Sequence, residues 1–518
     1  MESPVNLARY FVRKSIESIQ EESSNTQLKR TLSALNLVSL GIGCIIGAGI
    51  FVLTGQAAAE YAGPAIVISF ILSGLACAFA GLCYAELASA LPVSGSAYTY
   101  AYATLGETLA WAMGWLLILE YGLASSTVAV GWSGYLASFL KDFGLIIPPE
   151  LSQPYLDLIA DPAHPGQKIL AATGHFNLPA FLGIMMVTAL LIIGVSESAK
   201  VNNVIVFVKL FVVLTFICVG VFYVNPANWH PFIPENTGPG QYGFDGILRG
   251  AGVIFFAYIG FEAVSTAAQE AKNPQRDMPI GILGSLFICT ALYIVVSLVL
   301  TGIVPYKELK VPDPMAVAID KIDIPWLTFG HWRLLPILVK LGAVMGLSSV
   351  MLVLVYGQTR IFYMMGKDSL IPQVFCKLHS RFKTPYLNTL IVGIIVSLSA
   401  ACVPISVLGN LVSMGTLFAF CIVCFSVMYL RYTRPDLPRT FKTPFMPVIP
   451  LLGIAACGYL IYGIGWDIFL KLRYYFLGGI VVYFAYSQFT SKLGKEFVAT
   501  SGASGDTILT PKLKDAAN

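Results

Sequence analysis

The amino-acid sequence predicts an all-α membrane protein, and three observations indicate this class. Only 12% of the 518 residues are charged, against roughly 25% in an ordinary soluble domain. Apolar residues make up 56% of the chain, and the mean hydropathy is +0.75. Long apolar stretches recur along the chain, each near the length of about 20 residues that a helix needs to cross a bilayer. Because this small number of charged residues could not cover the surfaces of several soluble domains, the outer surface is expected to face lipid.

The composition also argues against several kinds of partner. A net charge of +4, without a run of arginine and lysine with interleaved aromatic residues, does not predict binding to nucleic acid. All of the ten cysteines but Cys376 lie in apolar stretches, where cysteine behaves as a small hydrophobic residue. The five histidines all fall in connecting segments. We therefore expect no disulfide, no metal site and no cofactor.

About twelve apolar stretches are long enough to form membrane-spanning helices. The third and the eighth are longer than a bilayer requires, so these two helices are expected to tilt. The expected spans are residues 34–54, 64–90, 107–139, 178–196, 201–224, 247–268, 279–303, 335–359, 386–402, 406–430, 447–469 and 474–490.

The segments outside these spans predict the orientation. Most lysines and arginines lie in the segments on the side of the two chain ends, although the segment after the seventh span is also basic. We therefore expect both termini in the cytoplasm and the protein in the plasma membrane. Apolar and basic residues of 1–33 suit an amphipathic helix on the inner leaflet, with a disordered tail as the alternative. Residues 491–518 are polar and are expected to be a disordered cytoplasmic tail.

The first span is interrupted by glycine. It reads LGIGCIIGAGIF over residues 40–51, with glycines at 41, 43, 47 and 49. Each glycine disfavours a helix by about 1 kcal/mol relative to alanine. One interpretation is close packing against another helix through small residues. The other is an unwound segment whose free N–H groups bind an anion, because non-helical backbone at this depth lines a cavity or is buried in protein.

The sixth span has the same character. Residues 250–262 read GAGVIFFAYIGFE, again rich in glycine and ending in an acidic residue. Five spans separate it from the first, so the two cross the membrane in opposite directions. Paired interrupted helices of this kind indicate the binding site of a transporter. A half-helix N-terminus favours a carboxylate and freed carbonyls favour an ammonium group, so the expected substrate is an amino acid.

In these two stretches the chain resembles the amino acid–polyamine–organocation (APC) superfamily. More narrowly, it is similar to the bacterial branch of the cationic amino acid transporter family. The resemblance covers roughly residues 28–490 and rests on the order and spacing of several motifs. In the last motif, Lys367 and Ser369 depart conservatively from the more usual Arg-Asp-Gly pattern. The motifs are GIGCIIGAGIF (41–51), YAELASALPVSGSAYTYAY (84–102), FFAYIGFEAVS (255–265), EAKNPQRDMP (270–279) and GQTRIFYMMGKDSLIP (357–372).

The resemblance implies an inverted five-plus-five helix repeat of the leucine-transporter type, with discontinuous helices 1 and 6. Helices 1–5 would lie in residues 34–224, helices 6–10 in residues 247–430, and two additional helices in residues 447–490. It also implies that the substrate carboxylate binds backbone of the first helix and the amino group binds carbonyls of the sixth. Phe256 would be the aromatic gate. The implied binding residues are Ile45, Gly47, Ala48, Gly49, Phe256, Ala257 and Ile259.

Two charged residues lie deep inside spans. Lys209 is in the middle of the apolar run VIVFVKLFVV, where a lysine costs about 2.5–3.5 kcal/mol on insertion scales. In the family that the chain resembles, a lysine of the fifth helix occupies the place of sodium in sodium-coupled relatives. We therefore expect proton coupling through Lys209 and no sodium site, with a structurally paired lysine as the alternative. Glu120 is expected to pair with Lys209 or to share its proton, or else to be a structural carboxylate. Glu262 is expected to orient the unwound turn or to face a vestibule.

The expected function is secondary active uptake of L-amino acids with protons by alternating access, and the protein is not expected to be an enzyme. The substrates are expected to be either broadly neutral or cationic. An amino acid or polyamine exchanger on the same fold is the alternative. A membrane enzyme would need an intramembrane histidine, a metal cluster or a Ser/Asp constellation, and a channel would need a filter loop or a ring of charges. Side chains that we expect in the pocket wall include Met345, Leu347 and Ser348.

Overall fold

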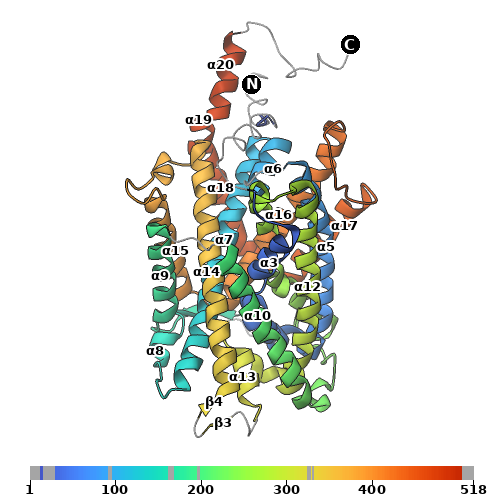
Figure 1. Cartoon of the computed structure of the whole chain (residues 1–518), viewed down its shortest axis with the longest axis vertical. Coiled ribbons are helices and arrows are strands. Elements are labelled where there is room, and N and C mark those ends of the chain that lie inside the picture. Colours follow the sequence, from blue (N-terminus) through green and yellow to red (C-terminus); the bar gives the residue numbers. More distant parts are fainter. Residues whose placement is uncertain are drawn as a thin grey trace.

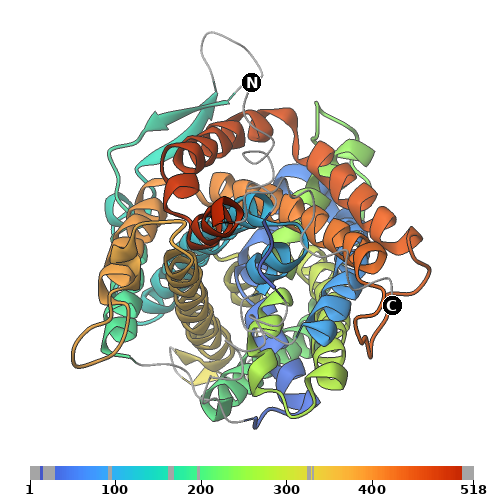
Figure 2. The same ribbon diagram turned by 90° about the horizontal axis from the view of Figure 1, so that it is seen from above.

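The computed structural model describes residues 12–15, 30–91, 96–160, 168–194, 199–323, 328–329 and 332–503. These residues form a bundle of helices whose long axes run roughly along the vertical of Figure 1. Seen from above, the outer helices surround others in the interior (Figure 2). Strands in the described part form two hairpins, β1 (Leu156–Ala160) with β2 (Lys168–Ala172) and β3 (Thr328–Phe329) with β4 (Trp332–Arg333). The predicted all-α class is therefore confirmed.

Each expected span corresponds to a helix. The long helices are α3 (Ala34–Ile45), α5 (Ile66–Ala90), α7 (Glu107–Lys141), α9 (Leu178–Ile193), α10 (Ala199–Gly220), α11 (Gly243–Ile254), α12 (Pro274–Ile303), α14 (Leu334–Lys367), α15 (Tyr386–Cys402), α16 (Ile405–Thr433), α17 (Val448–Ile464) and α18 (Trp466–Val482). Shorter helices are α4 (Thr54–Ala57), α6 (Ser96–Thr104), α8 (Pro149–Ser152), α13 (Pro314–Asp320), α19 (Gln488–Thr490) and α20 (Lys492–Ala503).

Length and apolar composition make 8 helical segments of the described chain long enough to cross a membrane. Four further apolar helices are shorter, namely α3, α9, α15 and α17. The exact number of crossings and the inverted repeat stay predictions. Burial distinguishes the centre from the periphery: the apolar window of Gly243–Ser265 is 94% buried, whereas that of Trp466–Thr490 is 22% buried. The segment that contains the second glycine-rich stretch therefore lies inside the bundle.

Both ends of the described chain meet at the same end of the bundle. The Lys14 ammonium group lies 3.3 Å from an Asp368 carboxylate oxygen, and Lys492 N donates to Asp368 O. Residues 12–15 are not helical, and the rest of the expected amphipathic segment lies outside the described residues. The expectation of disorder from residue 491 onward is wrong for α20. Ser491 Oγ accepts a hydrogen bond from Gly494 N, as a helix N-cap does, and this contact helps the helix to begin there.

Candidate functional site

The first glycine-rich helix is interrupted as the sequence predicts. α3 ends at Ile45, and Ile46 is extended, with φ −72° and ψ 98°. The chain becomes helical again at Ala48 and continues as a π-helical turn over Gly49–Leu53. The first N–H groups of a helical segment have no acceptor within that segment, so those at the start of the second half are available to a ligand. The interruption therefore has the geometry that suits an anionic group.

The second interruption lies in the segment that begins as α11. A 3₁₀ turn over Phe255–Tyr258 follows α11, and Ile259 is extended with φ −60° and ψ 131°. Gly260 has a φ of +123°, a conformation that L side chains rarely adopt, and a Cβ there would lie 2.8 Å from the carbonyl carbon of Cys44. A second 3₁₀ segment begins at Glu262. The glycine is thus required at this position by both conformation and space.

The two interruptions touch each other. A Cβ added to Gly49 would lie 2.2 Å from Ala257 Cα, so the absence of a side chain lets the two backbones approach. The Tyr293 hydroxyl of α12 lies 2.8 Å from both Ile45 O and Ala257 O. One hydroxyl hydrogen donates to one of these carbonyls at a time, so Tyr293 connects the two breaks. The sequence analysis missed Tyr293, although a tyrosine in the middle of an apolar span signals a hydroxyl that needs a partner.

All seven implied binding residues lie at these two breaks and are buried. Phe256 is 5% exposed, and its carbonyl accepts a hydrogen bond from Ile259 N. The Ala257 carbonyl is one of the two that face Tyr293. A carbonyl oxygen has two lone pairs, so each can still accept from an ammonium group. The structure thus brings the residues together, while their ligand roles and the gating role of Phe256 stay predictions.

Lys209 of α10 contacts the last turn of α3, just before the first break. Its side chain is fully buried, and Nζ donates to Gly43 O over 2.7 Å. A Cβ on Gly346 of α14 would lie 3.1 Å from Lys209 Cγ, so the lysine is enclosed between α3, α10 and α14. It is therefore attached by a hydrogen bond to the half-helix that ends at the binding region.

Glu120 lies beside a second acidic side chain. Its carboxyl group interacts electrostatically with the Glu262 carboxyl group, and both glutamates are 1% exposed. The two Glu262 oxygens accept from Gly260 N at 3.0 and 2.9 Å, so Glu262 orients the unwound turn, as one sequence hypothesis proposed. Glu120 Oε1 is buried without a hydrogen-bond partner among the described groups. The structure therefore associates Glu120 with Glu262, a pairing that the sequence did not suggest.

The expected pocket wall on α14 is partly wrong. Met345 is 47% exposed on the outside of the bundle, whereas Leu347 is buried. Ser348 Oγ accepts a hydrogen bond from Trp132 Nε1 of α7 over 2.9 Å. Gly47 instead faces Val350. A Cβ atom added to Gly47 would lie 3.4 Å from the two valine methyl groups. The reason is helical periodicity, because Val350 and Met345 lie on different faces of α14.

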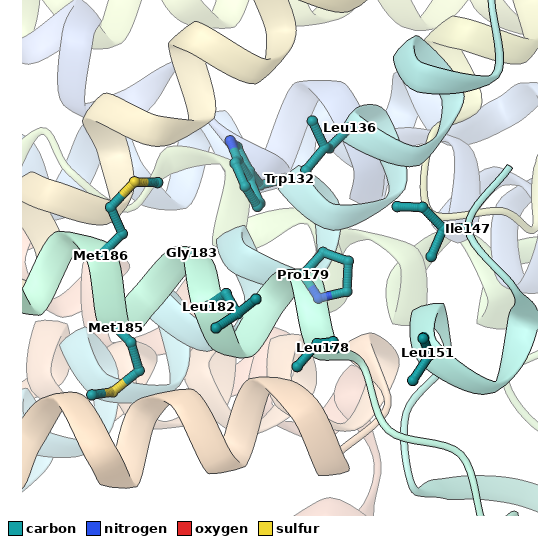
Figure 3. Close-up of a pocket in the computed structure, with 10 residues that line it drawn as sticks. All are labelled: Trp132, Leu136, Ile147, Leu151, Leu178, Pro179, Leu182, Gly183, Met185 and Met186. Atoms are coloured by element: carbon teal, nitrogen blue, oxygen red, sulfur yellow. The ribbon is translucent and has the colours of Figure 1, made fainter. Parts of the chain in front are cut away.

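A cavity of about 600 Å³ lies away from the helix breaks. Figure 3 shows its wall, formed by apolar side chains of α7, α8, α9 and the loop before α8, with the Trp132 indole nitrogen as the exception. Leu182 and Met186 of this wall are more than half exposed, so the cavity opens on the flank of the bundle. A wall of this kind offers no partner to a zwitterion, and the cavity does not serve as the amino acid site.

Comparison with known proteins identifies relatives along nearly the whole chain. The model of the amino acid permease family matches residues 32–471. A methylthioribose transporter of Bacillus subtilis is 44% identical over 489 residues, which cover 94% of this chain and 100% of the relative. The branched-chain amino acid permease BcaP of the same organism is 45% identical over 94% of this chain and 99% of its own. A vacuolar cationic amino acid transporter 2 of Arabidopsis thaliana is 37% identical over 82% of this chain and 63% of its own.

The geometry of the site and the names of the relatives indicate the same class of protein. Two interrupted helices meet in the interior of a helical membrane bundle, and the relatives are named as transporters or permeases, not as enzymes. The chain therefore belongs to the amino acid permease family of the APC superfamily, and it is a multi-pass membrane transporter.

Proposed function

We propose that the protein takes up neutral L-amino acids together with protons by alternating access. The observation that carries this proposal is the contact between the two helix breaks, Gly49 against Ala257. Free N–H groups at one break and carbonyls at the other suit the carboxylate and the ammonium group of an amino acid. Because these ligands are backbone groups, they bind any α-amino acid and leave the side chain to the surrounding wall.

The neutral class is favoured over the cationic class by two observations. Val350 faces Gly47 at the first break and presents an apolar surface there. The relative named for branched-chain amino acids is 45% identical, whereas the relative named for cationic amino acids is 37% identical. We therefore expect leucine, isoleucine and valine to bind more tightly than arginine or lysine.

A second candidate substrate is methylthioribose, because a relative named for it is 44% identical over almost the same residues. This compound has no ammonium group and no carboxylate, so it would not use both breaks in the same way. Thermal shift measurements on the purified protein with leucine, arginine and methylthioribose distinguish the three. Stabilisation by leucine alone supports the proposal, and stabilisation by methylthioribose alone replaces it.

Proton coupling is proposed for Lys209 and for the pair Glu120 and Glu262. An ionisable group inside the membrane is a functional candidate because burial without function is costly. Lys209 is attached to Gly43 O of α3, so a change in its charge alters a contact of the first half-helix. Two carboxylates side by side in a buried environment repel each other, which favours an arrangement with one proton between them.

Uptake into liposomes tests the coupling. With an inward proton gradient and no sodium, the protein should concentrate leucine, because protonation drives the transition between the two conformations. Lys209→Met should lose concentrative uptake but retain leucine-induced thermal stabilisation and counterflow. Lys471→Met removes an exposed lysine of α18 and serves as the control. Uptake that does not depend on the proton gradient refutes the coupling, and counterflow without concentrative uptake in the unmodified protein supports the exchanger.

A further inference from the structure

A basic pocket lies outside the amino acid site, where the end of α14 meets the end of α9 and the start of α15. It is a cavity of about 210 Å³. α9 and α15 pack against each other on one flank of the bundle (Figures 1 and 2). The side chains that matter for the pocket chemistry are Tyr356, Thr359, Arg360, Tyr363, Lys383 and Thr384.

The pocket is held in shape by hydrogen bonds between the three helices. Thr384 Oγ1 donates to Ile192 O of α9 over 2.7 Å, and Asn388 Nδ2 of α15 donates to Thr359 O of α14 over 2.8 Å. Lys383 has a φ of +57°, and its N–H donates to His379 O. These contacts fix the backbone of the loop that carries Lys383 against the helix that carries Arg360, and both exposed residues line the pocket.

The two cations lack a carboxylate partner within the described part of the chain. Neither Arg360 nor Lys383 forms an ion pair within those residues, whereas the buried Lys340 and the partly exposed Arg431 each contact a carboxylate oxygen within 2.9 Å. The Arg360 guanidinium instead lies 4.8 Å from the Tyr356 ring centre, an arrangement that orients its edge. A planar guanidinium and an ammonium group beside one cavity are a typical environment for a phosphate.

Apolar surface begins directly beside this pocket. Thr389 lines the pocket, and from Leu390 onward α15 exposes Leu390, Ile394 and Ile395, with 38%, 41% and 60% exposure. The neighbouring α9 exposes Ile193. A free phosphate would use only the cations, whereas a phospholipid would use both the cations and the apolar strip. Basic pockets between membrane helices are known to bind anionic headgroups.

We propose that this pocket binds the phosphate headgroup of an anionic phospholipid, whose acyl chains lie along α9 and α15. The lipid then joins the ends of α14, α9 and α15 by contacts that the protein alone does not make. Because the ligand binds the folded state, it stabilises the protein by an amount that rises with the logarithm of its concentration relative to its dissociation constant.

Thermal unfolding in an uncharged detergent tests the proposal. Phosphatidylglycerol should raise the unfolding temperature of the unmodified protein in a saturable manner, and phosphatidylcholine should not. Arg360→Gln and Lys383→Gln should each weaken the apparent affinity for phosphatidylglycerol about fivefold, the value for the loss of one cation near an anionic lipid. Arg360→Lys keeps the charge and should retain most of the affinity. For a variant that is too unstable for thermal unfolding, native mass spectrometry compares the number of phosphatidylglycerol molecules retained by the variant and by the unmodified protein.

The matched control is Arg381→Gln. Arg381 is an exposed cation of the same loop and does not line the pocket. Its guanidinium carbon lies 5.6 Å from the centre of the Phe382 ring. This variant should bind phosphatidylglycerol as the unmodified protein does. Equal weakening in Arg381→Gln and in the pocket variants would reduce the effect to the general charge of the loop and overturn the proposal. Glycerol phosphate at matched ionic strength should have no effect, and stabilisation equal to that by phosphatidylglycerol would exclude a lipid as the required ligand.

Discussion

At the scale of single residues, the site depends on positions where a side chain is missing. Gly49 lets the first break approach Ala257, and Gly260 supplies a positive φ beside Cys44. Gly47 lies at the same break, but a Cβ there would make only ordinary contacts of 3.4 Å with Val350. The two glycines of the first break therefore differ in function, which their common appearance in the sequence does not show.

Gly49→Ala should abolish leucine uptake, because its Cβ would lie 2.2 Å from the Ala257 Cα and backbone would have to move. Overpacking of this kind also destabilises a protein by about 1–3 kcal/mol. Uptake into liposomes and leucine-induced thermal shift measure both effects. Gly47→Ala is the control and should retain binding, since a methyl group fits there. Equal activity in the two variants would contradict the close contact between the breaks.

Tyr293→Phe should weaken the connection between the breaks. The substitution keeps the ring in place but removes the hydroxyl that faces Ile45 O and Ala257 O. Loss of a buried hydrogen-bond partner costs about 1–3 kcal/mol, so the unfolding temperature should fall and leucine should bind more weakly. Thermal unfolding with and without leucine measures this. Unchanged stability and affinity would show that Tyr293 contributes nothing to the site.

At the scale of the elements, buried ion pairs join helices that are distant in the sequence. Glu86 of α5 is 1% exposed and accepts two hydrogen bonds of 2.8 Å from the Arg431 guanidinium of α16. Thr443 N donates to the same carboxylate, and Arg439 lies 3.3 Å from it. In the sequence Glu86 lies near the end of the expected span 64–90, where water at the membrane interface would solvate a carboxylate. The structure gives it a different role, as the link between α5, α16 and the segment after α16.

Glu86→Gln should destabilise the protein by about 3 kcal/mol, the lower end of the range for breaking a buried pair, because Arg431 is partly exposed. Thermal or denaturant unfolding measures the change. Glu308→Gln breaks the exposed pair with Lys321 and should change the stability by less than about 1 kcal/mol. A similar loss in both variants would mean that burial does not strengthen the pair at Glu86.

At the scale of the whole molecule, the two described ends of the chain meet at Asp368 on one end of the bundle. The distribution of lysines and arginines between the connecting segments predicts that this end is cytoplasmic. The proposed phospholipid pocket lies near the same end, since Arg360 precedes Asp368, the residue that caps α14, by about two helical turns. One orientation therefore accounts for the termini and for the position of the basic pocket.

A protease-sensitive tag at the C-terminus should be digested in inverted membrane vesicles and protected in intact cells, because the distribution of basic residues predicts that this end is cytoplasmic. A tag in the outer hairpin β1–β2 should show the opposite pattern and serves as the control. Digestion of the C-terminal tag in intact cells would reverse the orientation and place the basic pocket on the outside.

The amino-acid sequence was enough to predict the membrane class, the positions of the apolar helices, the two glycine-rich interruptions and the buried position of Lys209. These features depend on local composition and on neighbours along the chain, so one sequence is enough to recognise them. The pairing of residues distant in the sequence became visible in the folded bundle: Glu120 with Glu262, Tyr293 with two carbonyls, Glu86 with Arg431, and Arg360 with Lys383 across one cavity. Such contacts depend on how the helices pack and on how each is rotated about its axis, which the periodicity of an almost uniformly apolar helix does not specify.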